Sequence, residues 1–482
     1  MLAAVVGGCA LTLTLGGATA GAAASPTVTA ATGGGGKPVI PGFTSFDLGV
    51  VGYNQSEVFL SGTASAYQGA APFGTDGKLG ASVATKAPYS TRAVVARPID
   101  RHDFNGTVVV EWLNVSGGAD AGPDWMLAHN QLVREGFAWV GISAQKVGVD
   151  ALKSTDPQRG DAVRYARLSH PGDSFSYDIF SQGGQAIRDN ARAILGGLKP
   201  KRLIAVGESQ SAGRLVTYID AVHPLVHVYD GFLVHSRFAG GAALSQAPQA
   251  NVSVPSPLAI RADLGVPVLV FQTESDVVFS NLTARQPDTN TYRVWEVAGT
   301  AHFDFYGLSI GLTDIGDGQA GAAILASMLH PTNQPNANFT CNSPINTGPA
   351  HYVLDNAFRR LDQWVRSGVL PPIAPRLQTT GVSPVVFAKD AKGNVLGGIR
   401  TPAVDVPVAT LSGQGQSGNA FCFLFGTTRA FTAAELAALY PNRHEFVERW
   451  DEAIESARHA KFLVSADAKE LRSAAKQSTV GG

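Results

Sequence analysis

A serine-centred turn lies within residues 201–218, KRLIAVGESQSAGRLVTY, and is the stretch of the chain best suited to chemistry. Residues 203–206 are apolar and favour a buried strand, whereas the apolar spacing from Ala212 to Tyr218 favours a helix. A strand that turns sharply through small residues into a helix presents the serine at its apex as a nucleophile. We therefore predict that Ser209 is a nucleophile.

Ser211 is the alternative nucleophile, because small residues also stand two positions before it and two after it. We favour Ser209 because the apolar run closes at Gly207, and the apex is expected two residues past that glycine. A turn rich in glycine and serine that performs no chemistry has the same local pattern. The prediction therefore depends on finding partners for the serine elsewhere in the chain.

Candidate partners follow the turn in a suitable order. A serine nucleophile needs a base that takes its proton and an acid that orients the base. Where the serine lies on such a turn, the chain order is serine, acid, histidine, with each residue on a loop after a strand. Asp276 and His302 each follow an apolar run that favours a strand. We predict a triad of Ser209, Asp276 and His302, with Glu274 as the alternative acid.

Donors for the oxyanion are expected from the backbone. The N–H group of Gln210, directly after the nucleophile, is the first. The second is expected from the loop after the predicted strand at residues 107–113, and Val115 and Asn114 are both candidates.

The elements that must position these residues alternate between strands and helices. Such alternation favours a mostly parallel central sheet with helices on both faces, which is the α/β class. Beyond the strand and helix of the serine turn, the predicted strands cover residues 57–67, 89–98, 107–113, 137–143, 227–235, 267–272 and 292–297, and the predicted helices cover residues 124–135, 178–198 and 351–368.

Composition excludes several classes of function. The 482 residues carry a formal net charge of -1 without a basic stripe, so we expect no nucleic-acid partner. The histidines are scattered, no CxxC pair occurs, and the glycine-rich segments form no nucleotide-binding motif. We therefore predict neither a metal nor a cofactor, and we expect a small-molecule substrate.

The N-terminus has the pattern of a secretory signal. Residues 1–24 lack charge after the amino terminus and end in small residues, although no basic residue precedes the apolar stretch. Lipidation at Cys9 is the alternative, and no later run is long enough to span a membrane. We predict export, and a disulfide between Cys341 and Cys422, since free thiols are less common in exported chains.

Several longer segments resemble a bacterial family that is described only as alpha/beta hydrolase domain proteins. They are VVVEWLNVSGG from Val108, YDIFSQGGQAIR from Tyr177, AVGESQSAGRLVTYI from Ala205, HPLVHVYDGFLVHSR from His223, VPVLVFQTESDV from Val266 and GGIRTPAVDVPVA from Gly397. The resemblance extends from about Phe43 to Arg449 and implies an α/β-hydrolase fold and a serine esterase. It implies no particular substrate.

These observations predict one α/β-hydrolase domain with additions. Arg400 is a further candidate for binding a polar group of the substrate, although we favour a structural role for this arginine in its loop. Phe175, Tyr177 and Phe238 are expected to line an apolar pocket. The expected parts are a signal peptide (1–24), a disordered linker (25–42), the domain (43–460) with inserted loops (144–177 and 236–263) and a C-terminal extension (305–460), and a C-terminal tail (461–482) that is frayed from Lys476. We predict an exported carboxylic-ester hydrolase. The alternatives are an amidase, peptidase or acyltransferase with the same residues, or a binding protein without activity.

Overall fold

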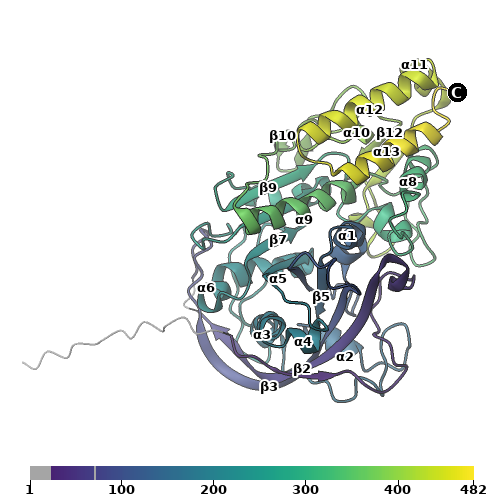
Figure 1. Ribbon diagram of the computed structural model, residues 1–482. Coiled ribbons are helices and arrows are strands. Elements are labelled where there is room, and N and C mark those ends of the chain that lie inside the picture. Colours follow the sequence, from purple (N-terminus) through teal and green to yellow (C-terminus); the bar gives the residue numbers. More distant parts are fainter. Residues whose placement is uncertain (1–22, 70–71) are drawn as a thin grey trace, which may run out of the picture.

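The computed structural model describes residues 23–69 and 72–482, and a nine-stranded sheet runs through the centre of this part of the chain (Figure 1). The strand order is β1-β2-β3-β5-β4-β6-β7-β8-β9. Neighbouring strands from β1 through β2 and β3 to β5 are antiparallel. From β5 through β4 and β6 to β9, neighbouring strands are parallel. The bounds are β1 Thr27–Ala30, β2 Tyr53–Gln68, β3 Ser82–Pro98, β4 Thr107–Trp112, β5 Ala138–Ile142, β6 Arg202–Glu208, β7 Gly231–His235, β8 Val268–Thr273 and β9 Tyr292–Val297.

The parallel strands are apolar on both faces because helices cover both. Val109, Ile204 and Leu233 belong to the core on one face, and their neighbours Val108 and Leu203 belong to the core on the other. This arrangement explains why these strands are continuous apolar runs rather than alternating ones. The predicted α/β class is therefore confirmed.

Two helix layers enclose the sheet (Figure 1). Helices α1 (Pro123–Arg134) and α9 (Ala350–Ser367) pack against each other on one face. On the other face lie α3 (Ser176–Asp189) and α5 (Gln210–Thr217), and the long strands β2 and β3 curl round α3. The remaining helices are α2 Lys146–Ala151, α4 Ala191–Ile194, α6 His223–Val226, α7 Glu274–Val278, α8 Ala320–Leu329, α10 Pro402–Asp405, α11 Ala433–Leu439, α12 Arg443–His459 and α13 Ser465–Gln477.

The predicted disordered linker contains a strand, so that prediction was wrong, and the predicted C-terminal tail contains a packed helix. The expected linker contains β1, which pairs with β2 from Thr27 opposite Ser61 to Ala30 opposite Val58. The expected tail contains α13, which packs against α8 and α12. Its buried residues Ala468, Leu471 and Ala475 recur at helical spacing, so the helix has an apolar face that its neighbours cover.

Two small sheets lie in the C-terminal part, β10 (Thr379–Val382) with β11 (Val385–Phe387) and β12 (Ala409–Ser412) with β13 (Thr427–Ala430). Cys341 and Cys422 form a disulfide bond, which confirms the predicted pairing. The bridge joins loops that are 81 residues apart in sequence.

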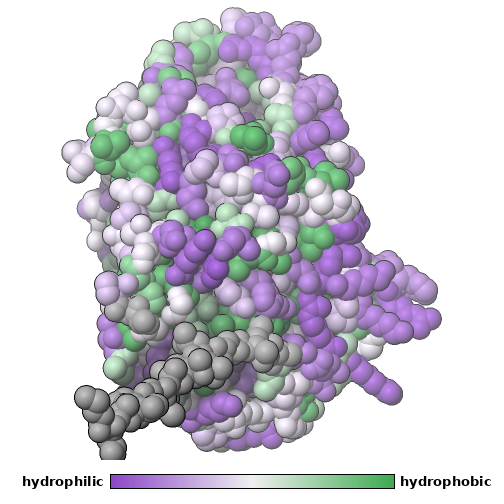
Figure 2. All heavy atoms as spheres, turned by 90° about the vertical axis from the view of Figure 1, so that its left-hand side faces the viewer, coloured by the Kyte–Doolittle hydropathy of each residue, from purple (hydrophilic) through white to green (hydrophobic). Residues whose placement is uncertain are grey.

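The predictions of a signal peptide up to Ala24 and of lipidation at Cys9 concern residues that lie almost wholly outside the described ones. Within residues 23–69 and 72–482, none of the helices has the length and apolar character that a membrane crossing requires. Figure 2 shows small apolar patches separated by polar side chains on one face of the molecule.

Candidate active site

The serine turn has the geometry that the sequence predicts. Strand β6 ends at Glu208, helix α5 begins at Gln210, and Ser209 between them has a φ of 58°. This left-handed conformation is costly for a residue with a Cβ atom and is typical of strained functional turns. A Cβ atom at Gly207 would lie 2.9 Å from the Ser211 carbonyl oxygen, so the turn requires glycine there.

Ser211, the alternative nucleophile, is fully buried and has a structural hydrogen bond. Its hydroxyl donates to the Glu208 carbonyl oxygen at 2.8 Å. The two serines of the turn therefore differ in environment, and only Ser209 contacts the predicted base.

Three predicted residues from different segments of the chain, including Asp276 in α7, come together at this turn. His302 Nε2 lies 2.7 Å from Ser209 Oγ, and His302 Nδ1 lies 2.5 Å from Asp276 Oδ1. The second carboxylate oxygen of Asp276 accepts hydrogen bonds from Thr273 N–H at 2.7 Å and from Ser236 Oγ at 2.8 Å. These bonds hold Asp276 so that its other oxygen faces the imidazole ring.

The electrostatics of this group favour an ionised acid and a basic histidine. Burial raises the pKa of Asp276, but the neighbouring His302 and the donated hydrogen bonds lower it by more, so the net shift is downward. Burial lowers the pKa of His302, but the carboxylates of Asp276 and Glu208 raise it above its ordinary value. His302 is therefore disposed to accept a proton from Ser209.

Glu274, the alternative acid, does not contact His302. Its carboxylate accepts hydrogen bonds from Gly299 N–H at 2.6 Å and Gly413 N–H at 2.8 Å. Burial raises its pKa to about 7. Glu274 connects the loop before His302 to the C-terminal region, so the structure does not support it as the orienting acid.

The backbone N–H groups predicted to stabilise the oxyanion differ in whether they already donate a hydrogen bond. The prediction for Asn114 was wrong, because its N–H group donates to the Ala121 carbonyl at 2.9 Å and is already used. Within the part of the chain that the structure describes, the N–H groups of Gln210 and Val115 have no hydrogen-bond partner. The Gln210 donor lies at the first position of α5, where backbone N–H groups point out of the helix.

Arg400 has the structural role in its loop that the sequence analysis favoured over substrate binding. Its guanidinium donates to Asp405 at 2.5 Å and to the Val404 carbonyl at 3.0 Å, and it also contacts Val395 and Asp390. Arg400 thus joins loops of the C-terminal part and does not line the cavity beside Ser209.

Glu208 is a site residue that the sequence analysis missed. Its Oε1 atom lies 3.3 Å from His302 Nε2, and its Oε2 atom accepts a hydrogen bond from Asn114 Nδ2 at 3.2 Å. Burial raises its pKa to about 7. The available signal was a single charged residue at the end of an otherwise apolar strand, directly before the nucleophile.

A cavity of about 530 Å³ opens onto Ser209 and His302. Phe238 lines it as predicted, whereas Phe175 and Tyr177 are buried in the core and do not. Much of its surface comes from an aromatic wall, which we define as Phe339, Phe421, Phe423 and Phe425. The disulfide between Cys341 and Cys422 links the two loops that carry this wall.

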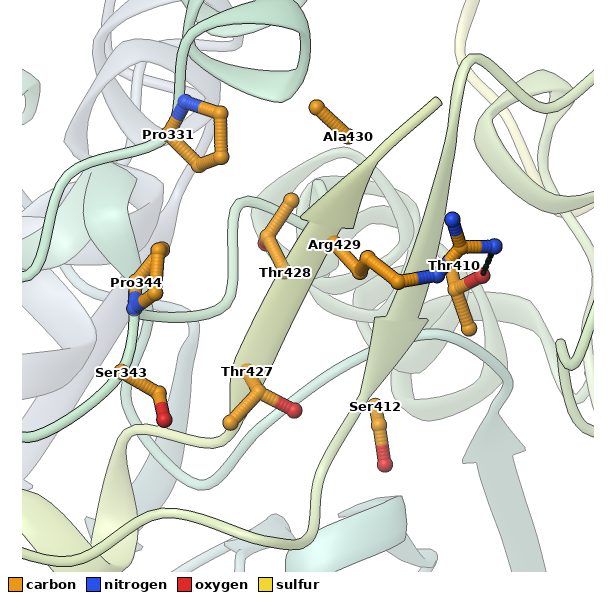
Figure 3. Close-up of a pocket in the computed structure, with 9 residues that line it drawn as sticks. All are labelled: Pro331, Ser343, Pro344, Thr410, Ser412, Thr427, Thr428, Arg429 and Ala430. Atoms are coloured by element: carbon orange, nitrogen blue, oxygen red, sulfur yellow. Dashed lines mark hydrogen bonds between the residues drawn. The ribbon is translucent and has the colours of Figure 1, made fainter. Parts of the chain in front are cut away.

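A second cavity, of about 490 Å³, lies beside β12 and β13 (Figure 3). Arg429 extends across it from β13 and donates a hydrogen bond to Thr410 Oγ1 at 3.2 Å. Its lining has serine and threonine hydroxyls, but it includes no histidine or carboxylate that could activate them. The cavity beside Ser209 is therefore the better candidate for the active site.

Comparison with protein families matches residues 17–473 to the family described as alpha/beta hydrolase domain. A search of curated proteins finds no match. Similar solved structures include a putative dienelactone hydrolase from Klebsiella pneumoniae subsp. pneumoniae, with 14% identity and a TM-score of 0.25 over 49% of this chain and 85% of that chain. A serine hydrolase without lid from Xanthomonas campestris has 13% identity and a TM-score of 0.26 over 43% and 78% of the two chains. The rice cell wall degrading esterase LipA from Xanthomonas oryzae has 13% identity and a TM-score of 0.21 over 39% and 43%. At these sequence identities and TM-scores, the solved structures give no information about the activity of this chain.

Proposed function

The chain belongs to the alpha/beta hydrolase domain family, and from this premise we propose that it is a serine hydrolase that cleaves carboxylic esters. The observation that carries the proposal is the continuous contact from Ser209 Oγ through His302 to Asp276. A hydroxyl, an imidazole and a carboxylate in this order are the groups that acyl transfer through a covalent intermediate requires.

In the proposed reaction, Ser209 Oγ attacks the ester carbonyl carbon and His302 Nε2 takes the hydroxyl proton. Asp276 stabilises the imidazolium that forms, and the N–H groups of Gln210 and Val115 stabilise the negative charge on the carbonyl oxygen. The carbon–oxygen bond to the alcohol then breaks, and His302 transfers its proton to the departing oxygen. Water, deprotonated by His302, then attacks the acyl carbon. The bond between this carbon and Ser209 Oγ breaks, His302 returns the proton to Oγ, and the carboxylic acid leaves.

The cavity supports an ester with a bulky, uncharged and apolar group. Phe238 stacks beside His302 with the ring centres 5.8 Å apart, and Phe279 links His302 to Phe423 at 6.2 Å and 5.6 Å. Among the residues that the structure describes, the lining has Glu208 and His302 as its ionisable members and includes no lysine or arginine. An anionic substrate group would lie near Glu208 without a cation to compensate its charge, so we expect the cavity to disfavour it.

The test of the nucleophile is intact-mass analysis after reaction with a fluorophosphonate probe. We expect one adduct on the wild type, its loss in Ser209→Ala and its retention in Ser211→Ala. The second variant is a matched control, because it removes a hydroxyl two residues away that does not contact His302. An adduct that disappears only in Ser211→Ala would refute the assignment of Ser209, and no adduct on the wild type would refute the serine hydrolase.

Substrate class is tested by comparing nitrophenyl esters with matched anilides. We expect faster cleavage of the esters, and a higher kcat/KM for a phenylbutyrate ester than for an acetate or an anionic hemisuccinate ester. Faster anilide turnover would instead identify an amidase, and preference for the hemisuccinate would contradict the apolar site.

We also propose that the protein acts outside the cytoplasm. The uncharged leader expected at residues 1–24 supports export, and so does the disulfide between Cys341 and Cys422, since disulfides persist in oxidising compartments. Amino-terminal sequencing of the protein recovered from the native culture medium or cell envelope tests this. A chain found intact in the cytoplasm would refute it.

A further inference from the structure

A second carboxylate contacts the histidine of the candidate active site. Asp276 lies at Nδ1 of His302, and Glu208 Oε1 lies 3.3 Å from Nε2, the nitrogen that also contacts Ser209 Oγ. Both carboxylates are buried, and Asn114 donates a hydrogen bond to the far oxygen of Glu208. The proposed reaction requires Asp276 but gives no role to Glu208.

The contact between Glu208 and Nε2 requires a proton to be favourable. A neutral imidazole whose Nδ1–H donates to Asp276 has only a lone pair at Nε2, and a carboxylate oxygen beside it is repelled. The contact becomes attractive when Nε2 carries the proton that Ser209 releases. The geometry is thus more favourable for the imidazolium than for the resting histidine, which is the requirement for a group that accelerates a reaction.

The other titratable groups around Glu208 do not supply that cation. Asp276 and Asp124 are acids, and burial raises the pKa of Asp124 well above its ordinary value. His235, on β7, also faces Glu208, but burial lowers its pKa to about 4, so it is neutral near pH 7. His302 is therefore the group whose positive charge Glu208 compensates.

We propose that Glu208 is a positioning residue of this hydrolase, a second carboxylate partner that stabilises the imidazolium of His302 at Nε2 during proton transfer. The proton moves from Ser209 Oγ to Nε2, where Glu208 compensates the charge, and it then passes to the departing alcohol oxygen. Asn114 holds Glu208 in place, which gives the loop after β4 a role besides that of an oxyanion donor. The proposal rests on the proposed function, because it assigns His302 as the base.

The test is the pKa of His302 and the pH profile of catalysis in Glu208→Gln, which keeps the side-chain shape and removes the charge. An opposite charge at this range raises the pKa of a histidine by about 1–3 units. We expect the His302 pKa, measured by NMR of ring-labelled histidine, to fall by about one unit or more. The acidic limb of kcat/KM should move to lower pH by the same amount, and kcat on the plateau should fall about tenfold or more with little change in KM.

Glu274→Gln is the matched control. Glu274 is equally buried and its pKa is also raised to about 7, but its hydrogen bonds go to Gly299 and Gly413 rather than to His302. We expect this variant to leave the pKa of His302 unchanged. Glu208→Asp retains a charge at a greater distance and should give an intermediate shift, and it serves if the Gln variant fails to fold.

An unchanged His302 pKa in Glu208→Gln, or an equal shift in Glu274→Gln, would overturn the proposal. The NMR titration needs no substrate, and the His302 resonance is identified by its loss in His302→Gln. A wild type that does not react with the fluorophosphonate would refute the proposed function, whereas the titration would still decide whether Glu208 acts on His302.

Discussion

The edge of the sheet that carries Ser209, Asp276 and His302 differs from the aromatic wall in how its residues are held. Ser209 follows β6 directly, whereas Asp276 lies in α7, three residues after β8, and His302 lies five residues after β9. These strands are parallel neighbours or next neighbours in one sheet. The wall residues come from loops that have little regular structure and are joined by a disulfide. The positions of Ser209, Asp276 and His302 thus depend on the hydrogen-bonded strands of the sheet. The position of the aromatic wall depends instead on cross-links between loops that are distant in sequence.

The two regions meet at a few contacts. Phe303, directly after His302, donates its N–H to the Leu424 carbonyl at 3.4 Å, and Asn346 donates to the Gly299 carbonyl at 3.1 Å. Because the wall lines the cavity whereas the hydrogen bonds of His302 go to Ser209 and Asp276, we expect changes in the wall to alter substrate preference more than the chemical step. The variants below test this separation, from the largest expected effect to the smallest.

Asp276→Asn should have the largest effect. An amide cannot stabilise the imidazolium and favours the wrong tautomer of His302, a change that costs about 10⁴-fold in kcat in comparable triads. We expect such a loss for every ester, whatever its size, measured as initial rates under saturating substrate. A loss confined to bulky esters would place Asp276 with the wall rather than with the chemistry.

Replacing both Cys341 and Cys422 with serine should loosen the wall but leave the sheet edge intact. Disulfides of this loop length typically stabilise a fold by about 2–4 kcal/mol, so we expect a lower melting temperature. We expect KM for the phenylbutyrate ester to rise while kcat/KM for the acetate ester stays near the wild-type value. Thiol reductant added to the wild type should reproduce the change and have no effect on the double variant, which is the control.

Phe423→Ala should raise KM by less than the loss of the disulfide does. The side chain is 51% exposed beside the cavity and packs edge-on against Phe279, and such aromatic contacts contribute roughly 1 kcal/mol, or about fivefold in affinity. We expect this rise in KM for the phenylbutyrate ester only. Val382→Ala is the matched control, since that apolar side chain is 70% exposed on β10 and does not line the cavity. An equal change in KM in the two variants would show that Phe423 does not contribute to substrate binding.

Arg400→Ala should have the smallest effect on activity. Its hydrogen bonds join loops of the C-terminal part, so we expect a loss of about 1–2 kcal/mol in the free energy of unfolding, measured with urea. We expect kcat/KM to stay within about twofold of the wild type. A loss of kcat/KM confined to substrates with polar groups would instead indicate that Arg400 binds substrate.

Much of the sheet was predictable because its parallel strands are short apolar runs between turn residues, as at residues 107–113 and 292–297. Strand β1 and helix α13 were not, since β1 is a short edge strand and α13 was taken for a tail, and both depend on neighbours that are distant in sequence. The order of Ser209, Asp276 and His302 along the chain was also predictable, because each of them follows an apolar strand. Asp276 was preferred to Glu274 on weaker evidence, because both residues follow the same strand.

The sequence by itself determined the α/β class, the turn that presents Ser209 and the candidate partners, since strand ends and turns are set by residues close together in the chain. Only the tertiary structure decided which acid faces His302, that the Asn114 N–H and Arg400 are already engaged, and that Glu208 reaches Nε2. The physical reason is that hydrogen-bond partners and side-chain directions depend on packing between segments far apart in sequence. A carboxylate's role is fixed by the groups it faces, and those are decided when the chain folds.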